Sequence, residues 1–308
     1  MRCGVVSTQP IRSPGPPPPS DPPPAGGGGG GDGAGRGPRW RLAVVLGVVV
    51  ALLVVGVVVL LTSTSSPVAV RPRCTVTAPP NSPTLPSSYA GTPEQLDSAA
   101  TIAGVGRRLG VPDRAVTIAL ATAVQESGLA NLAGGDRDSV GLFQQRPSQG
   151  WGTVAQISDP VHAATAFYDA LLQVPGWQTL DVTAAAQAVQ RSGYPEAYAD
   201  HEPEARLLAV AFLGQAPTAL TCSDLDLAAP SADGVADLAR TELGDARLSG
   251  PQATAPGWAD ATWLVAHAAR LGLDRVGFDG RTWTTASGRW DTTGPADGRL
   301  TLHRAGDP

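Results

Sequence analysis

Glu126 is the residue of this sequence whose position best suits acid–base chemistry. It ends an apolar stretch, AVTIALATAVQES, whose spacing predicts a helix from Pro112-Asp113 to Gly128. Burial and the negative end of the helix dipole should both disfavour an ionised carboxylate there. A carboxyl group that keeps its proton can protonate a glycosidic oxygen. From the helix alone, however, an ordinary surface glutamate is the better interpretation.

The residues that follow change this balance. Glu126-Ser127 precedes a Gly/Asp loop and then Gly141-Leu142-Phe143-Gln144. Over roughly residues 92–215 the chain resembles the lysozyme-like lytic transglycosylase (SLT) superfamily, in which a Glu-Ser pair and a Gly-Leu-(Met)-Gln element build the cleft. The longer pattern, through Gln145-Arg146-Pro147 and Trp151-Gly152, is similar to a group of secreted or anchored actinobacterial wall proteins.

This resemblance implies that the substrate is the glycan strand of peptidoglycan, cut between N-acetylmuramic acid and N-acetylglucosamine. Glu126 would be the general acid and then the base. The candidate substrate-binding residues are Ser127, Phe143, Gln144, Gln145, Trp151, Gln190 and Tyr198. Phe143 stands where Met is more usual, and its ring could pack beneath a sugar or belong to the core.

The chain departs from the family at a later helix. Where the family often has Ala-Tyr-Asn, this chain has Ala188-Val189-Gln190. Gln190 can replace the Asn, but the aromatic residue is missing. Tyr194 or Tyr198 could supply the cleft tyrosine, and we favour Tyr198.

Two aspartates in the loop GGDRDS leave the product open. A hydrolase commonly uses a second carboxylate to activate water. A transglycosylase, as the family is understood, lets a hydroxyl group of the substrate attack instead. Asp136 and Asp138 could be that second carboxylate, or turn residues that cap backbone amides. We favour the turn interpretation, which leaves both products possible.

The N-terminal residues predict an anchor. Residues 1–38 are rich in Pro and Gly and have almost nothing apolar to bury, so we expect a disordered cytoplasmic tail. Residues 42–62 are apolar and uncharged over a length that could cross a bilayer, and they exceed the core of a cleaved signal sequence. The flanking arginines favour a cytoplasmic N-terminus. We therefore predict a single-pass plasma-membrane protein with its catalytic domain outside the cell.

The charge of the remaining chain excludes one class of partner. The whole chain carries −5 and residues 1–62 carry +3 (five Arg, two Asp), which leaves −8 for residues 63–308. Such an acidic segment does not attract a phosphate backbone, so we expect no nucleic-acid partner. The sequence does not identify a protein partner.

Cysteine and histidine usage adds two expectations. Cys74 and Cys222 bracket the motif region and predict one disulfide, with two unpaired thiols as the alternative. No Cys/His spacing matches a metal site, so we expect neither a metal nor another cofactor.

The expected fold is mainly α. A spacer rich in Pro, Ser and Thr (63–91) precedes a lysozyme-like helical domain (92–222), whose first helix starts with the capping residues Thr92-Pro93-Glu94-Gln95 and stops at Gly110. A linker (223–257) leads to a small α+β unit (258–308). That unit distantly resembles M15-type peptidases but lacks their zinc ligands, so we interpret it as noncatalytic.

Two hypotheses follow. The first is a lytic transglycosylase or a lysozyme-type glycoside hydrolase that cuts peptidoglycan with a single glutamate. The second is a noncatalytic peptidoglycan-binding or cell-envelope assembly protein that keeps the lysozyme-like fold, which the missing aromatic residue favours.

Overall fold

The computed structural model describes residues 39–63, 71–231, 234–244 and 248–307. The chain divides into two compact units, Met1–Val68 and Ala69–Pro308. The tail predicted at residues 1–38 lies outside the described residues.

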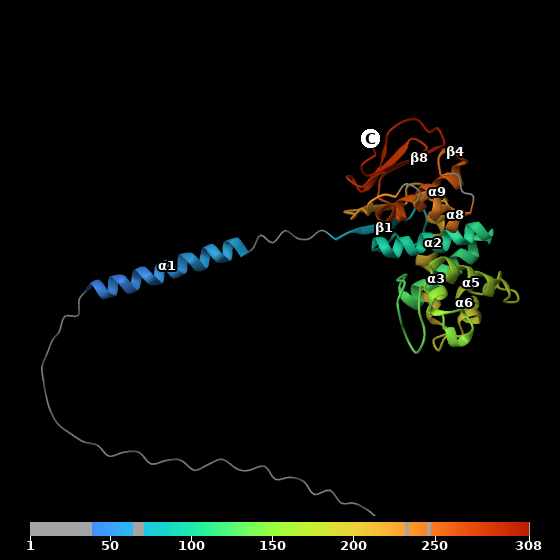
Figure 1. Cartoon of the computed structure of the whole chain (residues 1–308), viewed down its shortest axis with the longest axis horizontal. Helices are drawn as coiled ribbons and strands as arrows, with labels where there is room; N and C mark the ends of the chain where they lie inside the picture. Colours follow the sequence, from blue (N-terminus) through green and yellow to red (C-terminus); the bar gives the residue numbers. More distant parts are fainter. Residues whose placement is uncertain (1–38, 64–70, 232–233, 245–247, 308) are drawn as a thin grey trace, which may run out of the picture. The chain divides into compact units, whose positions relative to one another are not determined.

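The first unit contains the helix α1 (Arg39–Ser63), drawn in blue in Figure 1. Its side chains are described at positions 43, 44 and 46–58, and they are exposed. A search of the described residues finds no helix that is both long and apolar enough to cross a membrane. This contradicts the transmembrane helix predicted at residues 42–62. The predicted single-pass localisation and membrane contact rested on that helix, and they are corrected with it.

The second unit combines helices with two antiparallel sheets. Its helices are α2 (Pro93–Leu109), α3 (Asp113–Ser127), α4 (Val154–Ile157), α5 (Pro160–Leu172), α6 (Val182–Gln190), α7 (Glu202–Phe212), α8 (Gly234–Leu243), α9 (Thr254–Ala266) and α10 (Ala268–Leu271), with 3-10 helices η1 (Pro147–Gln149) and η2 (Ala197–His201). One sheet has the order β2 (Ser88–Gly91), β1 (Arg73–Thr77), β3 (Leu220–Ser223). The other has the order β4 (Gly250–Pro251), β8 (Arg299–Arg304), β5 (Leu273–Phe278), β6 (Arg281–Thr284), β7 (Arg289–Thr292).

The prediction of a mainly α fold is wrong. The structure is about 48% helix and 16% strand. Strands β1 and β2 lie in residues that were predicted as a spacer. Local sequence could not predict them, because β1 also pairs with β3, which is remote in sequence. In β1, Cys74 and Val76 are buried while the residues at its ends are exposed, so the strand has the period-2 pattern of a half-buried sheet.

The predicted disulfide is confirmed. Cys74 and Cys222 are bonded across paired positions of β1 and β3, with their Cα atoms 4.0 Å apart. Both residues are buried. The bond joins positions 148 residues apart and so closes a long loop around the helical region, which reduces the entropy of the unfolded chain.

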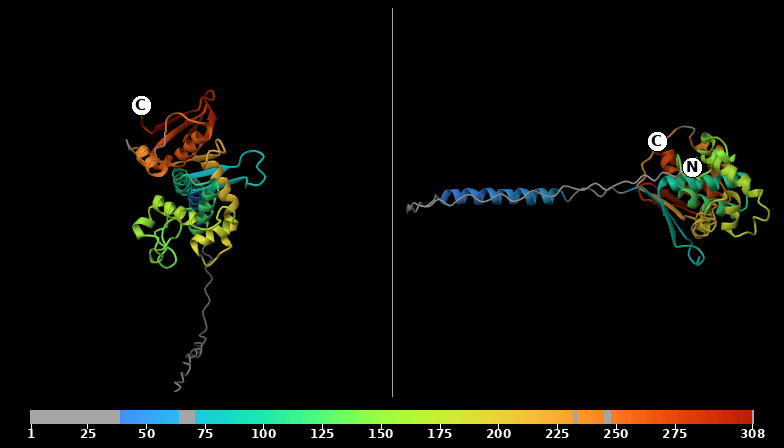
Figure 2. Two further views of the ribbon diagram at one scale, coloured as in Figure 1. Left: turned by 90° about the vertical axis from the view of Figure 1, so that its right-hand side faces the viewer. Right: turned by 90° about the horizontal axis from the view of Figure 1, so that it is seen from below.

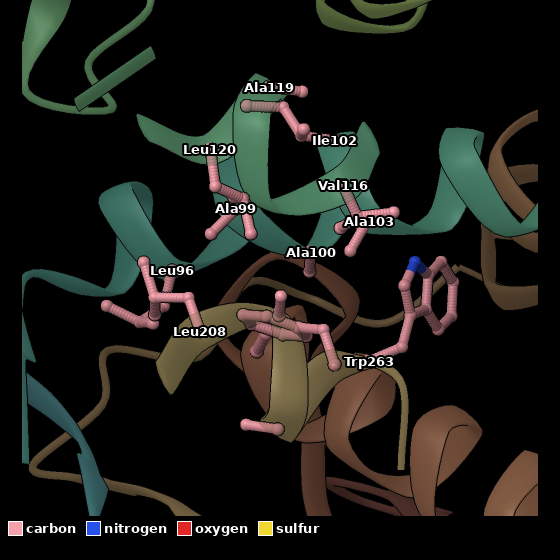
Figure 3. Close-up of a cluster of buried hydrophobic side chains, with 14 of the residues drawn as sticks. Leu96, Ala99, Ala100, Ile102, Ala103, Val116, Ala119, Leu120, Leu208 and Trp263 are labelled. Atoms are coloured by element: carbon pink, nitrogen blue, oxygen red, sulfur yellow. The ribbon is translucent and has the colours of Figure 1, made fainter. Parts of the chain in front are cut away.

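Helix α2 is the centre of the second unit. The predicted capping box is present, since Thr92 and Gln95 cap each other's backbone, and the helix ends at the left-handed Gly110 as expected. Residues 98–106 are all buried, so every side of the helix is covered. Figure 3 shows Leu208 of α7 and Trp263 of α9 on one side of α2. Leu120 of α3 lies on the other side.

The second unit is layered around α2. Figures 1 and 2 show the five-stranded sheet at one end, then α8 and α9, then α2, and α3, α5 and α6 at the other end. Residues predicted as the linker 223–257 include α8, which packs against α2. The helix α9 of the predicted C-terminal unit also packs against α2 and α7. The motif residues lie at the α3 and α6 end.

Candidate active site

The motif residues line a groove. One pocket, of about 490 Å³, is lined by Glu126, Asp136, Arg137, Ser139, Gln144, Gln145, Arg146, Gln149, Trp151, Gln190, Arg191, Ser192, Gly193 and Tyr194. A second pocket, of about 710 Å³, shares Gln149, Trp151, Gln190 and Arg191 with the first. The two pockets therefore adjoin at these four residues, and we call them together the groove and its two compartments.

Glu126 is placed in this groove by the end of α3. Helix α3 stops at Gly128, whose left-handed conformation (φ 61°) turns the chain away just after the Glu-Ser pair. The Nε2 of Gln95 donates to the carbonyl of Gly128 over 2.8 Å, so the start of α2 holds the end of α3. Glu126 is half-buried, with its carboxyl group on the wall of the first pocket.

Tyr198 is the partner of Glu126. Its hydroxyl group donates to Oε1 of Glu126 over 2.6 Å. The side chain of Tyr198 is fully buried on η2. Burial and the neighbouring Glu126 carboxylate raise the pKa of Tyr198 well above its usual range. Tyr198 therefore remains a hydrogen-bond donor. It is not among the residues that line the first pocket, whereas Tyr194 is.

Ser127 has a structural position. Its Oγ lies 2.7 Å from the carbonyl of Leu142 and 3.0 Å from that of Ala123. The hydroxyl group thus ties the end of α3 to the Gly-Leu-Phe-Gln turn. Ser127 is not among the residues that line the groove, so it orients the site from behind the wall.

Gln144 reaches the groove through a tight turn. It has a left-handed conformation (φ 46°), and its Nε2 donates to the carbonyl of Gly141 over 3.1 Å. The side-chain amide of Gln144 lies close over Gly135: a Cβ at that position would be 1.7 Å from its Oε1, so the amide would have to move.

Gln145 has a buried acceptor without a hydrogen-bond partner among the described residues. The side chain is 2% exposed and lines the first pocket. Its Nε2 donates to the carbonyl of Ala163 over 3.2 Å, which fixes the amide. Among the described residues, its Oε1 has no hydrogen-bond partner. A buried acceptor without a partner is costly unless water or a ligand donates to it.

Phe143 belongs to the core. Its side chain is fully buried and stacks on Phe167, with ring centroids 4.7 Å apart. The structure therefore brings its backbone, and not its ring, to the site. The carbonyl of Phe143 accepts from Nε2 of Gln190 over 2.8 Å, and Gln190 lines both compartments of the groove.

Asp136 and Asp138, the two aspartates of the loop, differ in their hydrogen-bond partners and in their exposure. Asp138 accepts from Nε of Arg146 over 2.6 Å and from the backbone N–H of Ser148 over 2.8 Å. Hydrogen bonds from Ser148 and then Arg146 hold the pKa of Asp138 well below its usual range. Asp138 is thus a turn residue outside the groove lining. Asp136 lines the groove, but its side chain is 90% exposed and lies 3.8 Å from Arg137.

Trp151 lines the groove, as the sequence predicted, but several other lining residues were not predicted. Trp151 is half-buried and lines both compartments. The missed lining residues are mostly polar: Arg137, Ser139, Arg146, Gln149, Arg191, Ser192 and Gly193. Their positions in the sequence could have identified them, because they adjoin the predicted residues in the loops that follow α3 and α6. No group of three or more His, Cys, Asp or Glu within the described ranges could hold a metal ion.

Comparison with known proteins adds no relative. No protein-family model matches the chain, and no curated protein matches it. The resemblance to lytic transglycosylases therefore rests on the motif residues themselves and remains a prediction.

Proposed function

We propose that this protein cleaves the glycan strand of peptidoglycan with Glu126 as its single acid and base. The observation that carries the proposal is the hydrogen bond from the buried Tyr198 to Glu126, which lines a polar pocket. It supplies the tyrosine that the motif at residues 188–190 lacks.

The Tyr198 hydrogen bond gives the two carboxyl oxygens different roles. Because Oε1 accepts from Tyr198, the catalytic proton belongs on Oε2, for which no partner occurs among the described residues. A proton on Oε2 can pass to the glycosidic oxygen as the bond to the anomeric carbon breaks. The resulting carboxylate can then take a proton from the attacking hydroxyl group.

The lining of the groove fits a glycan. Amide side chains at Gln144, Gln149 and Gln190 offer donors and acceptors for sugar hydroxyl and acetamido groups. Trp151, at the junction of the two compartments, offers an apolar face for a sugar ring.

The carboxylates favour a transglycosylase over a hydrolase. A hydrolase of this kind would need a held second carboxylate to activate water. Asp138 is bound to Arg146 and Ser148, and Asp136 is largely in solvent. We therefore propose that the 6-hydroxyl group of the muramic acid attacks the anomeric carbon, Glu126 takes its proton, and a 1,6-anhydro end forms.

The test compares three versions of the full chain on purified peptidoglycan. The wild type should release fragments with 1,6-anhydro ends, identified by mass spectrometry. Glu126→Gln should release none, and the matched change Asp136→Asn should retain release. Equal release by Glu126→Gln would refute the assignment of the acid. Reducing ends that vanish in Asp136→Asn would instead indicate a hydrolase, and sedimentation with peptidoglycan without release would indicate the noncatalytic alternative.

A further inference from the structure

The short helix η2, which carries Tyr198, makes a further hydrogen bond to the end of α3. Nε2 of His201 lies 2.9 Å from Oε1 of Gln125. His201 is the last residue of η2, and Gln125 directly precedes Glu126 in α3. Both side chains are half-buried. This contact adds to the one between Tyr198 and Glu126, so two hydrogen bonds join η2 to the last turn of α3.

The geometry of η2 places both of its contacting side chains on one face. A 3-10 helix has three residues per turn, so Tyr198 and His201 lie above one another. Their partners Glu126 and Gln125 are neighbours in α3, just before the left-handed Gly128 ends that helix. One contact alone would let η2 rotate about it. Two contacts fix both the distance and the rotation of η2 relative to α3.

The position of η2 depends on side-chain contacts, because its own backbone gives little support. It is five residues long, and 3-10 helices stay short because their hydrogen-bond geometry is poor. It packs against α3, α6 and α7. His201 also stands at the N-cap position of α7, but its side chain makes no capping hydrogen bond there. The imidazole therefore contacts α3 instead of stabilising the start of α7.

The tautomer of His201 follows from its partner. Oε1 of Gln125 is an acceptor, so Nε2 of His201 carries the proton and donates it. Nδ1 lies 3.9 Å from Oε2 of Glu204, which is too far for a direct hydrogen bond. Nε2 bears a proton in this neutral tautomer and in the imidazolium ion alike. The contact with Gln125 therefore needs no change of charge, and His201 holds a position without carrying protons.

We propose that His201 is a positioning residue, which holds η2 so that the hydroxyl group of Tyr198 meets Oε1 of Glu126. Its effect on catalysis rests on the proposed function. Neither His201 nor Gln125 is among the residues that line the groove, so His201 acts through Tyr198 and does not touch the substrate. Small displacements of a catalytic group can lower the rate of a reaction strongly, which gives such a residue a measurable effect.

The kinetic test uses variants of the full chain on a soluble glycan. His201→Leu should lower kcat about fivefold with little change in KM, and His201→Gln, whose amide can donate from a similar position, should restore most of the loss. In the Tyr198→Phe background, His201→Leu should lower kcat no further, because both changes act on one contact. The matched control is His303→Leu on β8, which should keep the wild-type kcat. An unchanged kcat in His201→Leu, an equal loss in His201→Gln, or a full further loss in the Tyr198→Phe background would overturn the proposal.

A second measurement does not depend on cleavage. The four tyrosines are replaced with 3-fluorotyrosine, and the fluorine NMR resonance of Tyr198 is the one that Tyr198→Phe lacks. His201→Leu and Gln125→Leu should each shift this resonance, whereas His201→Gln should leave it close to its wild-type position. Circular dichroism checks that the variants are folded. A resonance that neither leucine variant moves would overturn the positioning role. If the wild type releases no product, the proposed function fails, and this resonance still decides whether His201 positions Tyr198.

Discussion

Glu126 and Glu242 are both glutamates near the C-terminal end of a helix, and both line a pocket. They differ in how many hydrogen bonds their carboxyl groups accept. Glu126 accepts one, from Tyr198, and is half-buried. Glu242 is 1% exposed, and both of its oxygens are occupied, Oε1 by Thr101 and Oε2 by Trp263 and His267. Of these two carboxyl groups, that of Glu126 therefore keeps one oxygen without a hydrogen-bond partner among the described residues, and that of Glu242 does not.

The surroundings of Glu242 form a buried ionic cluster that joins three helices. His267 is fully buried, with Nδ1 2.5 Å from Asp97 and Nε2 3.0 Å from Glu242. Burial would lower the pKa of His267, but the two carboxylates outweigh it and raise the pKa to about 9. Arg270 lies 3.1 Å from Asp97, so the cluster contains two positive and two negative groups. This cluster attaches α8 and the segment after α9 to the central helix α2.

Replacing each glutamate with glutamine should have the largest effects: Glu126→Gln should affect cleavage, and Glu242→Gln should affect stability. Glu126→Gln removes the proton donor, so cleavage should fall by about 10²–10⁴-fold while the thermal midpoint stays close to that of the wild type. Glu242→Gln directs an amide N–H₂ toward groups that already donate, so the midpoint should fall while cleavage per folded molecule persists. Differential scanning calorimetry and product release measure the two effects. A loss of cleavage without a loss of stability in Glu242→Gln would contradict the comparison.

Removing the buried imidazole should destabilise the fold. His267→Leu leaves Glu242 buried with one cationic neighbour fewer, and we expect a loss of about 3–5 kcal/mol in the free energy of unfolding. The matched control is His303→Leu, because His303 pairs with Asp274 over 2.7 Å where both side chains are partly exposed. That change should cost at most about 1 kcal/mol. Urea unfolding measures both, and equal losses would show that the cluster contributes no more than a surface pair.

Alkaline pH should weaken the same cluster. The pKa of His267 is raised in the folded state above its unfolded value of about 6.5, so its stabilisation is complete below that pH and is lost as the pH rises through about 9. The expected loss is at most about 3 kcal/mol. In acid, the pKa of Asp97, which burial raises but His267 and Arg270 lower overall, predicts a loss below about pH 4. Urea midpoints from pH 3 to 10 measure both limits, and His267→Leu should abolish the alkaline one.

The smallest expected effect concerns the tyrosine. Tyr198→Phe removes the hydrogen bond to Oε1 of Glu126 and should lower kcat about tenfold with little change in KM, because the acid is less well oriented. Tyr194→Phe is the matched control, since Tyr194 is 77% exposed and lines the pocket that Glu126 also lines. Steady-state rates on a soluble glycan measure both. If the two variants lose equal activity, the Tyr198–Glu126 contact does not orient the acid.

Local signals in the sequence predicted local structure. Thr92 and Gln95 define the start of α2, and Gly110 and Gly128 end their helices, because capping depends on residues within one turn. The Cys74–Cys222 pair was also predicted, but leaving out Cys3 depended on the transmembrane helix at residues 42–62, which the structure contradicts. The pairing of β1 with β3 is what brings these two cysteines together.

Only the tertiary structure decided which of these residues belong to the candidate site. Phe143 and Tyr198 are both fully buried aromatics, yet one stacks on Phe167 and the other donates to Glu126. The three-stranded sheet likewise depends on β1 meeting β3 across the whole helical region. The sequence by itself determined the start of α2, the ends of α2 and α3, and the position of Glu126 at a helix end. Partners that lie far apart in the chain determined its hydrogen bonds, because packing, and not local spacing, chooses them.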